Sequence, residues 1–417
     1  MEELFFLSED EVLYIQEKFS TPIFVYDRET MKKSANEVLS FPNAFGLTAR
    51  FAMKALPTRK ILQLFNSWGL HIDASSGWEV ERALLAGIPP SHIQLTAQEI
   101  PKNLKELIDK GVLFNACSLS QLRTYGEMFP GTEVSVRINP GLGSGSSNRT
   151  NVGGPSSSFG IWYEYLDKVY EIANKLNLKI TGLHTHIGSG SDPDIWVHCA
   201  HLALETACKM PEVTRLSLGG GYKVARMPDE KTANLQEIGK RILPDFLRFA
   251  EKFGRKLHLE IEPGTYLVAR AGTLICSVID VVNTGPRGYR FIKIDSGMTE
   301  NVRPAMYGAL HPLIVVPRNK KNSHKIDRFI VSGHCCESGD IFTPKRGDPE
   351  GLEPRELFEP QIGDALVVEG CGAYCASQSC KNYNSFPECG EILRLAPFEY
   401  EWIRKPQTLE QIIQNEI

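Results

Sequence analysis

Short β-type runs alternate with amphipathic helical runs from about residue 50 to residue 264, and this alternation limits the fold more than any other feature of the chain. The helical runs carry apolar residues at three- and four-residue spacing, which is the pattern of a helix that buries one face. Eight strand–helix units in succession predict an α/β fold of the (β/α)8, TIM-like barrel type. A doubly wound open sheet is the alternative, but the pattern contains no clear switch point. The eight runs are RFAMKA (50–55), HIDASS (71–76), HIQLTA (92–97), LFNACS (113–118), EVSVRINP (133–140), ITGLHTHIG (180–188), RLSLGGG (215–221) and KLHLEIEPG (256–264).

The pattern changes after about residue 270, where β-rich segments follow one another with turns between them and a helical segment, TLEQIIQNEI, ends the chain. A chain of 417 residues also exceeds the usual size of one domain. We therefore predict a second, C-terminal, mostly β domain of the barrel or sandwich type. The expected division is an N-terminal segment that joins the β domain (1–27), the barrel (28–268), and the β domain with its terminal helix (269–417).

Charge and composition exclude several classes of partner. A net charge of −4 and a charged fraction of 23% give no reason to expect nucleic acid or an anionic membrane as a partner. The opening MEELFFLSEDEV lacks the basic region and apolar run of a secretion signal, so we expect a cytoplasmic protein. Four late cysteines (Cys371, Cys375, Cys380, Cys389) lack the paired spacing of a zinc site, and we expect no metal.

Polar residues stand at the ends of the predicted barrel strands, where barrel enzymes carry their chemistry. In the last run, apolar residues alternate with a histidine and two glutamates, so one strand face is aliphatic and the other polar. Glu262 ends this run at the expected mouth of the barrel. Glu260, one layer deeper, is expected to pair with an interior cation such as His258 or Arg50.

Three further strand ends carry distinct chemical groups. Lys54 follows the first run in an apolar setting, and a desolvated lysine can form a Schiff base; a lysine that snorkels to solvent is the alternative. His184 and His186 end the sixth run and suit a metal, a satisfied polar site or a planar ring. LGGGY (218–222) ends the seventh run, and its backbone suits a phosphate as well as a tight turn.

The set of groups at one barrel mouth matches the needs of pyridoxal phosphate. Its aldehyde needs an amine, its phosphate needs backbone donors, its ring needs a flat partner, and its pyridine nitrogen needs an anion that keeps it protonated. The glycine- and serine-rich segment PGLGSGSSNRTNVGGPSSSFG (140–160) follows the fifth run and would lie on the same face. Its position favours an active-site loop over a simple connector.

With these motifs in their order, the chain resembles the alanine-racemase-fold pyridoxal-phosphate decarboxylases and, among them, the diaminopimelate decarboxylases. The resemblance runs from VYD (25–27) to the terminal helix. Its motifs include RPAMYGALH (303–311), CESGD (336–340), GAYCASQSCKNYNSFP (372–387) and the RINPGLGSGSSNRTNVGG loop. It implies pyridoxal 5′-phosphate as cofactor, decarboxylation of meso-2,6-diaminopimelate to L-lysine and carbon dioxide, and a homodimer with shared active sites.

The resemblance implies a role for each matching position. Lys54 would bind the cofactor aldehyde, His186 would stack on the ring, and Glu262 would pair with the pyridine nitrogen. The remaining contacts to the phosphate and the Schiff base would come from Asp73, Ser189, Gly219, Gly220, Gly221 and Tyr374.

The resemblance also implies how the substrate is held. Arg303 and Tyr307 would bind its distal carboxylate, and Tyr374 would approach the substrate as well as the phosphate. Cys336 and Glu337 would reach into the partner subunit's site. There Cys336 would donate a proton after carbon dioxide leaves, and Glu337 would bind the distal amino group.

One position departs from the family pattern. Diaminopimelate decarboxylases typically have arginine after EPG, where it helps to bind the distal carboxylate, whereas this chain has Thr265. Loss of a charge-assisted contact would cost about 1.5–3 kcal/mol, or roughly ten- to a hundredfold in affinity. Arg149, in the loop after the fifth run, and Arg270 are candidates to replace the cation, and the loop position favours Arg149.

Thr265 keeps two alternatives open. The first is a related decarboxylase that acts on ornithine, lysine or an amino-acid conjugate, although a simple diamine substrate would leave Arg303 without a carboxylate to bind. The second is a non-catalytic homologue that carries the cofactor or binds a protein. Both Lys54 and Cys336 are present, which argues against the second alternative.

Overall fold

The structure, a computed structural model, describes residues 2–143, 152–319 and 325–417. The chain divides into two compact units, which are treated separately below. Unit 1 comprises residues 1–32, 225–230 and 268–417, and unit 2 comprises residues 33–224 and 231–267.

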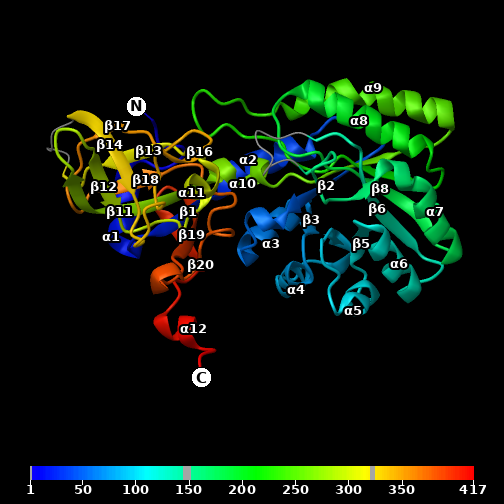
Figure 1. Ribbon diagram of the computed structural model, residues 1–417, viewed down its shortest axis with the longest axis horizontal. Coiled ribbons are helices and arrows are strands. Elements are labelled where there is room, and N and C mark those ends of the chain that lie inside the picture. Colours follow the sequence, from blue (N-terminus) through cyan, green and yellow to red (C-terminus); the bar gives the residue numbers. More distant parts are fainter. Residues whose placement is uncertain (1, 144–151, 320–324) are drawn as a thin grey trace. The chain divides into compact units, whose positions relative to one another are not determined.

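Unit 2 contains the barrel. Within its described residues, eight parallel strands pair side by side, and the last pairs with the first, so that the sheet closes on itself (Figure 1). This closure confirms the predicted (β/α)8 class, and each of the eight β-type runs overlaps one barrel strand. The strands, in order around the barrel, are β2 (Leu47–Ala52), β3 (His71–Ala74), β4 (Ile93–Leu95), β5 (Leu113–Ala116), β6 (Glu133–Asn139), β8 (Lys179–His184), β9 (Arg215–Ser217) and β10 (His258–Ile261).

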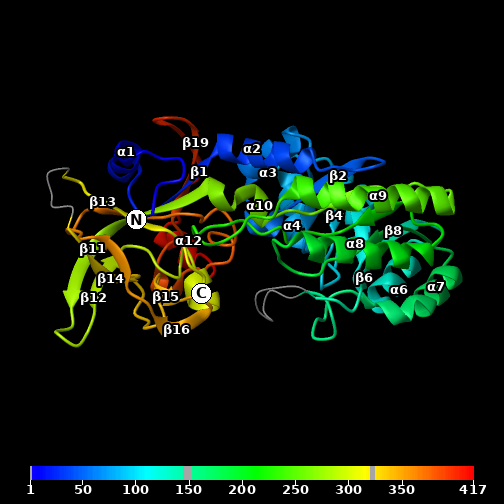
Figure 2. The same ribbon diagram turned by 90° about the horizontal axis from the view of Figure 1, so that it is seen from above.

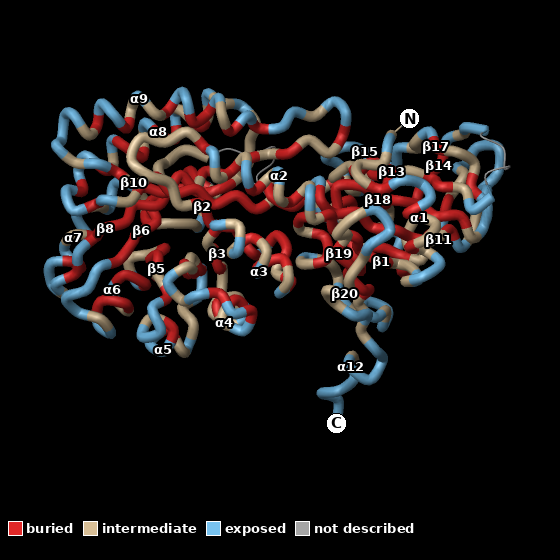
Figure 3. Tube along the Cα trace, turned by 180° about the vertical axis from the view of Figure 1, so that it is seen from behind, coloured by how far each residue is buried: buried red, intermediate tan, exposed pale blue. Residues whose placement is uncertain are grey.

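Helices surround these strands (Figure 2). The strands are largely buried, while the outer faces of the helices are exposed, as the three- and four-residue spacing requires (Figure 3). The helices are α2 (Arg28–Leu39), α3 (Arg59–Ser67), α4 (Gly77–Leu85), α5 (Leu104–Asp109), α6 (Leu119–Met128), α7 (Leu166–Lys175), α8 (Pro193–Cys208) and α9 (Leu235–Phe253), with the short α10 (Thr265–Val268) after the last strand. A two-residue strand, β7 (Ile161–Trp162), extends the sheet beside β6.

Local signals set the ends of these helices. The side chain of Asn234 caps α9 by accepting from the backbone N–H of Glu237, and Gly254 ends the helix with φ +62°. Ser76 caps α4 in the same way through the N–H of Glu79. These caps fix where each helix leaves the strand before it, and therefore which residues remain in the loops at the barrel mouth.

Unit 1 is built on a curled sheet of mixed direction, which confirms the predicted β-rich second domain. Within the described residues its main path runs β17-β14-β12-β11-β1-β19-β20, and β18 pairs with both β11 and β13. The strand from the start of the chain, β1, lies between β11 and β19. The strands are β1 (Ile23–Asp27), β11 (Gly272–Asn283), β12 (Arg290–Ile294), β13 (Leu313–Val316), β14 (Ile326–Ser332), β17 (Arg355–Phe358), β18 (Ala365–Val368), β19 (Gly390–Ala396) and β20 (Glu399–Arg404); β15 (Pro344–Lys345) and β16 (Asp348–Leu352) form a separate hairpin.

The described part of unit 1 has three α-helices: α1 (Glu9–Phe19), α11 (Arg303–Tyr307) and α12 (Leu409–Ile413). The sequence pattern predicted a helix only at the terminal segment TLEQIIQNEI, so α11 is a correction. It is five residues long, too short for an apolar period to be visible. Its first and last residues are four apart and therefore share one face, with the Arg303 guanidinium 5.8 Å from the centre of the Tyr307 ring.

Candidate active site

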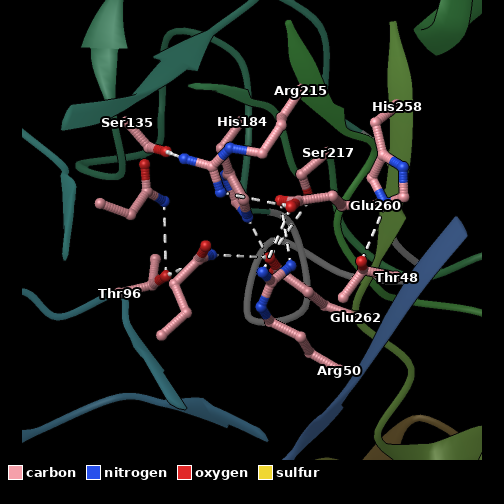
Figure 4. Close-up of polar contacts among 12 residues, drawn as sticks. Thr48, Arg50, Thr96, Ser135, His184, Arg215, Ser217, His258, Glu260 and Glu262 are labelled. Carbon is pink, nitrogen blue, oxygen red and sulfur yellow. Dashed lines mark hydrogen bonds and ion pairs between the residues drawn. The ribbon is translucent and has the colours of Figure 1, made fainter. Parts of the chain in front are cut away.

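Glu262 is the best-anchored carboxylate at the barrel mouth. It lies one residue beyond β10, where its backbone N–H donates to the carbonyl of Gly219 (2.8 Å). Its Oε2 lies 2.7 Å from His184 Nε2, and its Oε1 accepts from Gln94 Nε2 (3.3 Å) and Ser217 Oγ (3.2 Å) (Figure 4). Three barrel strands therefore fix this side chain.

The pKa values of two buried carboxyl groups at the mouth, Glu262 and Asp73, are shifted in opposite directions. Burial alone would raise the pKa of Glu262, but the charge and hydrogen bond of His184, helped by Arg50, outweigh it and lower this pKa to about 2. Burial, with the negative charge of Glu262, raises the pKa of Asp73 well above its usual value. Glu262 is therefore the acid of the pair that ionises more easily, and Asp73 is the acid that holds its proton more tightly.

His186 presents a neutral ring. Burial lowers its pKa well below the usual value, and the charges of Arg137 and Lys54 lower it further. Its Nδ1 atom is buried and has no hydrogen-bond partner in the part of the chain that the structure describes. A neutral, planar imidazole suits contact with the face of a flat ring.

The glycine triplet after β9 makes a close backbone cradle. A Cβ atom would lie 2.1 Å from the Glu262 carbonyl oxygen at Gly220 and 1.6 Å from the Gly188 carbonyl oxygen at Gly221, so only glycine fits. The Gly190 N–H donates to the Gly221 carbonyl (3.0 Å), which joins this turn to the loop that carries Ser189.

The three glycine N–H groups are not equivalent. That of Gly219 donates to Ser217 Oγ (3.1 Å), whereas those of Gly220 and Gly221 have no protein acceptor among the described residues. A phosphate held here would therefore bind to the second and third glycines of the triplet, and the first glycine shapes the turn.

Lys54 lies just beyond β2, in a single 3-10 turn (η1, Met53–Ala55). Its positive charge acts on two acids of the mouth, since it opposes the rise in the pKa of Asp73 and of Glu79. The side chain is exposed, which agrees with the alternative of a lysine that reaches solvent and not with a desolvated lysine. The apolar neighbours Met53 and Ala55 bury their own side chains and leave the lysine on the outer side of the turn.

A second acidic layer lies below Glu262. Glu260 accepts hydrogen bonds from Arg50 (Oε1–Nη2, 3.2 Å) and from Arg215 (Oε1–Nη1, 3.4 Å), while His258 bonds to Thr48 (2.8 Å) (Figure 4). Of the two partners expected for Glu260, Arg50 pairs with it and His258 does not. Arg50 and Arg215 compensate the charge of the buried Glu260 beneath the mouth.

The expected substrate contacts of unit 1 gather around residues 370–378. Tyr307 accepts a hydrogen bond from Gln378 Nε2 to its hydroxyl (3.0 Å), and Arg303 begins the same short helix. Tyr374 has φ +58°, a left-handed conformation that is costly for a residue with a side chain. Such strain is common at ligand-binding positions.

Adjacent cysteines in the turn after β14 differ sharply. Cys335 is buried, and its backbone N–H donates to Asp340 Oδ2 (2.9 Å); burial and the nearby Asp340 raise the pKa of its thiol to about 12. Cys336 is exposed, with its backbone N–H held by Asn384 Oδ1 (2.8 Å), and Glu337 is exposed beside it. Only Cys336 of the two presents its sulfur to solvent.

Thr265 is the first residue of α10 and is half-buried. Of the two arginines considered as replacements for the cation missing there, Arg270 lies over the Phe5 ring of unit 1, 4.2 Å from its centre. Arg149 lies outside the described residues.

Several members of the site were missed by sequence reasoning. His184 was noted without a role, and Gln94, Ser217 and the buried Arg137 were not singled out. What these residues share in the sequence is a polar side chain within an otherwise apolar strand. This pattern identifies site residues only when the pairing of the barrel strands is known. No group of three or more His, Cys, Asp or Glu side chains in the described ranges could hold a metal ion.

The described residues fit pyridoxal phosphate. The mouth combines an anionic carboxylate, a neutral ring with an unpartnered nitrogen, a lysine and a turn whose glycines allow close approach. Ionised Glu262 uses three of its roughly four acceptor sites, so one remains for a pyridinium N–H.

Comparison with known proteins gives an independent result. Residues 31–269 match the family described as "Pyridoxal-dependent decarboxylase, pyridoxal binding domain". The diaminopimelate decarboxylase of Escherichia coli strain K12 is 33% identical, over 99% of this chain and 97% of its own length.

Solved structures agree over nearly the whole chain. A crystal structure of diaminopimelate decarboxylase superposes with a TM-score of 0.92 at 32% identity and covers 100% of this chain and 99% of its own. That of the Helicobacter pylori diaminopimelate decarboxylase complexed with L-lysine gives 0.84 at 25% identity, over 97% and 98%. No helix in the described ranges is both long and apolar enough to cross a bilayer.

Proposed function

Because the chain belongs to the pyridoxal-dependent decarboxylases, we propose that it removes the carboxylate of meso-2,6-diaminopimelate to give L-lysine and carbon dioxide. The observation that carries this proposal is the anionic Glu262, held by His184 where a pyridine nitrogen needs a negative charge. Pyridoxal phosphate supplies the aldehyde that binds an amino acid and the ring that accepts the electrons of the broken carbon–carbon bond.

The residues of unit 2 hold and tune the cofactor. Glu262 would keep the ring nitrogen protonated, and His186 would lie against the ring face. Lys54 would bind the aldehyde and exchange with the substrate amine. The N–H groups of Gly220 and Gly221, with Ser189, would bind the phosphate, and Asp73 would lie near the aldehyde carbon as a neutral group.

The residues of unit 1 would bind the substrate and complete the reaction. Arg303 and Tyr307 would bind the distal carboxylate, and Tyr374 would contact both substrate and phosphate. Cys336 would return a proton to the α-carbon, and Glu337 would bind the distal amino group. Arg149 remains a candidate for the same carboxylate.

We further propose that the active protein is a cytoplasmic homodimer in which Cys336 and Glu337 of each subunit contribute to the active site of the other subunit. Support comes from the exposure of both side chains in the turn after β14. A mixing experiment tests this directly. Lys54→Ala and Cys336→Ala enzymes, each inactive alone, should recover about a quarter of wild-type activity when unfolded and refolded together, because half the dimers would then contain one intact site. Failure to recover activity, with dimers present, would contradict shared sites.

A substrate panel tests the function. The purified holoenzyme should release carbon dioxide from meso-diaminopimelate faster than from ornithine or lysine. Faster turnover of ornithine would overturn the assignment in favour of a diamine-forming decarboxylase, and turnover of none of them, with the cofactor bound, would favour a non-catalytic homologue.

A further inference from the structure

Among the described residues of unit 1, four arginines bury a guanidinium nitrogen that has no hydrogen-bond partner: Arg226, Arg303, Arg355 and Arg404. Arg355 and Arg404 form ion pairs with glutamates, whereas Arg226 and Arg303 form no ion pair with a described residue. Nη2 of Arg226 and Nε of Arg303 are both inaccessible to solvent and have no hydrogen-bond partner within residues 2–143, 152–319 and 325–417. A buried donor left unsatisfied costs about 1–3 kcal/mol, and more when it is charged. Two such donors on neighbouring cations indicate that this region is built to receive an acceptor from outside the chain.

Both arginines are attached to the same loop. Arg226 Nε donates to the carbonyl of Gly370 (2.9 Å). The next residue, Cys371, contacts the Asn301 amide through its sulfur (3.8 Å), and the Asn301 side-chain oxygen accepts from the backbone N–H of Arg303 (3.2 Å). These contacts place the guanidinium of Arg226 and the backbone of Arg303 beside the same segment, residues 370–371.

The expected carboxylate-binding residues lie around that same segment. Arg303 begins α11 and Tyr307 ends it, and Gln378 holds the Tyr307 hydroxyl (3.0 Å). Tyr374, with its strained backbone, lies between Gly370 and Gln378 in sequence. Arg226 therefore belongs to the group that includes Arg303 and Tyr307, although it comes from a distant and irregular part of the chain.

The cluster carries an excess of positive charge. Burial and the charge of Arg303 lower the pKa of Arg226 to about 10, so the Arg226 side chain is still a cation at neutral pH. His311 is kept neutral, because burial and the charges of Arg226 and Arg303 lower its pKa well below the usual value.

The acids nearby are already engaged. Glu230 accepts from the backbone N–H groups of Arg226 (2.8 Å) and Met227 (3.1 Å). Glu369 accepts from Thr273 and Phe5, and burial raises its pKa to about 7. Neither presents an oxygen to the two unpartnered guanidinium nitrogens.

The nearest sulfur is a weak partner for two cations. The pKa of Cys375 is raised by burial but lowered more strongly by a hydrogen bond from Cys371 and by the charges of Arg303 and Arg226. A thiol or thiolate offers no planar pair of oxygens, whereas a carboxylate matches the fork of a guanidinium. A carboxylate ligand is thus the acceptor that fits best.

We propose that Arg226 acts with Arg303 as the second cation that binds the distal carboxylate of the substrate. This proposal rests on the function given above and extends it. Thr265, which stands where the family pattern has arginine, carries a hydroxyl and no charge, and Arg270 is stacked on Phe5. Arg226 supplies the missing charge from a different element, which keeps the chain selective for an amino acid with a second carboxylate.

Binding of L-lysine and cadaverine to the holoenzyme tests the proposal. The two ligands differ only in that L-lysine has a carboxylate and cadaverine has none. This carboxylate is the distal carboxylate of diaminopimelate, which remains in the product. Titration calorimetry measures both dissociation constants without turnover. Wild type should bind L-lysine about ten- to a hundredfold more tightly than cadaverine. Arg226→Gln should lose most of this preference by weakening L-lysine, while the cadaverine constant changes less than about threefold. Arg226→Lys should keep part of the preference, since it keeps the charge but not the fork.

Matched variants separate this role from a structural one. Asp229 lies in the same 225–230 segment as Arg226 and pairs with the exposed Arg346. Arg346→Gln removes this pair and should leave the dissociation constants of L-lysine and cadaverine unchanged. An equal loss of L-lysine and cadaverine in Arg226→Gln and Arg226→Lys, or an unchanged preference in both, would overturn the proposal. The proposal would also be overturned if Arg149→Ala lost the preference for L-lysine over cadaverine while Arg226→Gln kept it. Absence of carbon dioxide release from diaminopimelate by wild type would instead overturn the proposed function.

Discussion

Nε2 of His184 lies 2.7 Å from Oε2 of Glu262, and this contact decides which buried acid of the barrel mouth carries the negative charge. The two residues come from β8 and from the end of β10, 78 positions apart. Without the histidine, burial would favour a neutral carboxyl at both Glu262 and Asp73, and neither could hold a proton on a ring nitrogen.

Glu262→Gln should lower kcat by at least about a hundredfold, because an amide keeps the shape of the side chain but carries no charge. The matched control is Glu260→Gln, two residues earlier on the same face of β10. It breaks the pairs with Arg50 and Arg215, so it should lower the melting temperature and leave kcat per cofactor-loaded enzyme within a few-fold. Steady-state kinetics and thermal unfolding measure the two effects. Equal kcat losses in both variants would show that the charge of Glu262 has no special role.

Lys54→Ala should abolish the absorbance near about 420 nm that a lysine-bound pyridoxal gives, together with turnover. Lys110→Ala, an exposed lysine between α5 and β5, serves as the control and should change neither signal. Retention of the band in the Lys54 variant would show that another amine binds the cofactor.

Substitution and thiol labelling should distinguish Cys336 from Cys335. Cys336→Ala should lower kcat about a hundredfold, as expected for loss of a proton donor, while Cys335→Ala should stay within about threefold. In the native protein a thiol reagent at pH 8 should modify Cys336 quickly and Cys335 slowly, because Cys335 is buried and the pKa of its thiol is about 12. Mass spectrometry of the labelled peptides tests this. Faster labelling of Cys335 than of Cys336 would show that Cys335, and not Cys336, is the accessible thiol.

Gly221→Ala should weaken cofactor binding and lower stability, since a Cβ there would lie 1.6 Å from the Gly188 carbonyl oxygen at φ +94°. Gly254→Ala is the control, because φ is +62° but no atom lies within 4 Å of the added carbon. It should cost only about 1 kcal/mol of unfolding free energy and leave the cofactor dissociation constant unchanged. Similar cofactor affinities in the two variants would argue against a phosphate site at the triplet.

Glu369→Gln should change how stability depends on pH. Burial raises the pKa of Glu369 to about 7 from an ordinary value of 4.5, so the folded protein binds the proton more tightly than the unfolded chain. Its stabilising effect is present below about pH 4.5 and is lost as pH rises to 7. The glutamine mimics the protonated form at every pH, so the variant should gain about 2–3 kcal/mol of unfolding free energy relative to wild type between pH 5 and pH 8.

Urea denaturation at several pH values, followed by tryptophan fluorescence, measures this difference. A difference that stays constant with pH would show that Glu369 is ionised throughout. Glu410→Gln, on the exposed α12, provides the control and should show no such gain with rising pH, because the pKa of that carboxyl is lowered by local hydrogen bonds rather than raised.

The barrel was predictable because its signal is local and repeated. Each strand run and helix run has its own period, and eight repetitions leave few folds that bury all the apolar faces together. The β-rich unit was predictable as a class but not in its strand order, since β1 pairs with strands more than 240 residues away. The short helix α11 left no periodic trace in the sequence.

The candidate site was predictable where chemistry follows a strand end, as at Lys54, Glu262 and the glycine triplet. Arg226 gave no such signal, because it lies in an irregular segment and its importance comes from Gly370 and Arg303, far away in the chain. The pairing of His184 with Glu262 was hidden for the same reason.

By itself the sequence determined the barrel, the β-rich second unit and the chemical groups available, since these depend on residue type and on spacing along the chain. Only the tertiary structure decided which of two buried acids ionises more easily, which of two adjacent cysteines is exposed, and that Arg226 and Arg303 are each left with an unpartnered donor. Those properties depend on burial and on charges a few ångströms away, and both are set by residues that become neighbours only when the chain folds.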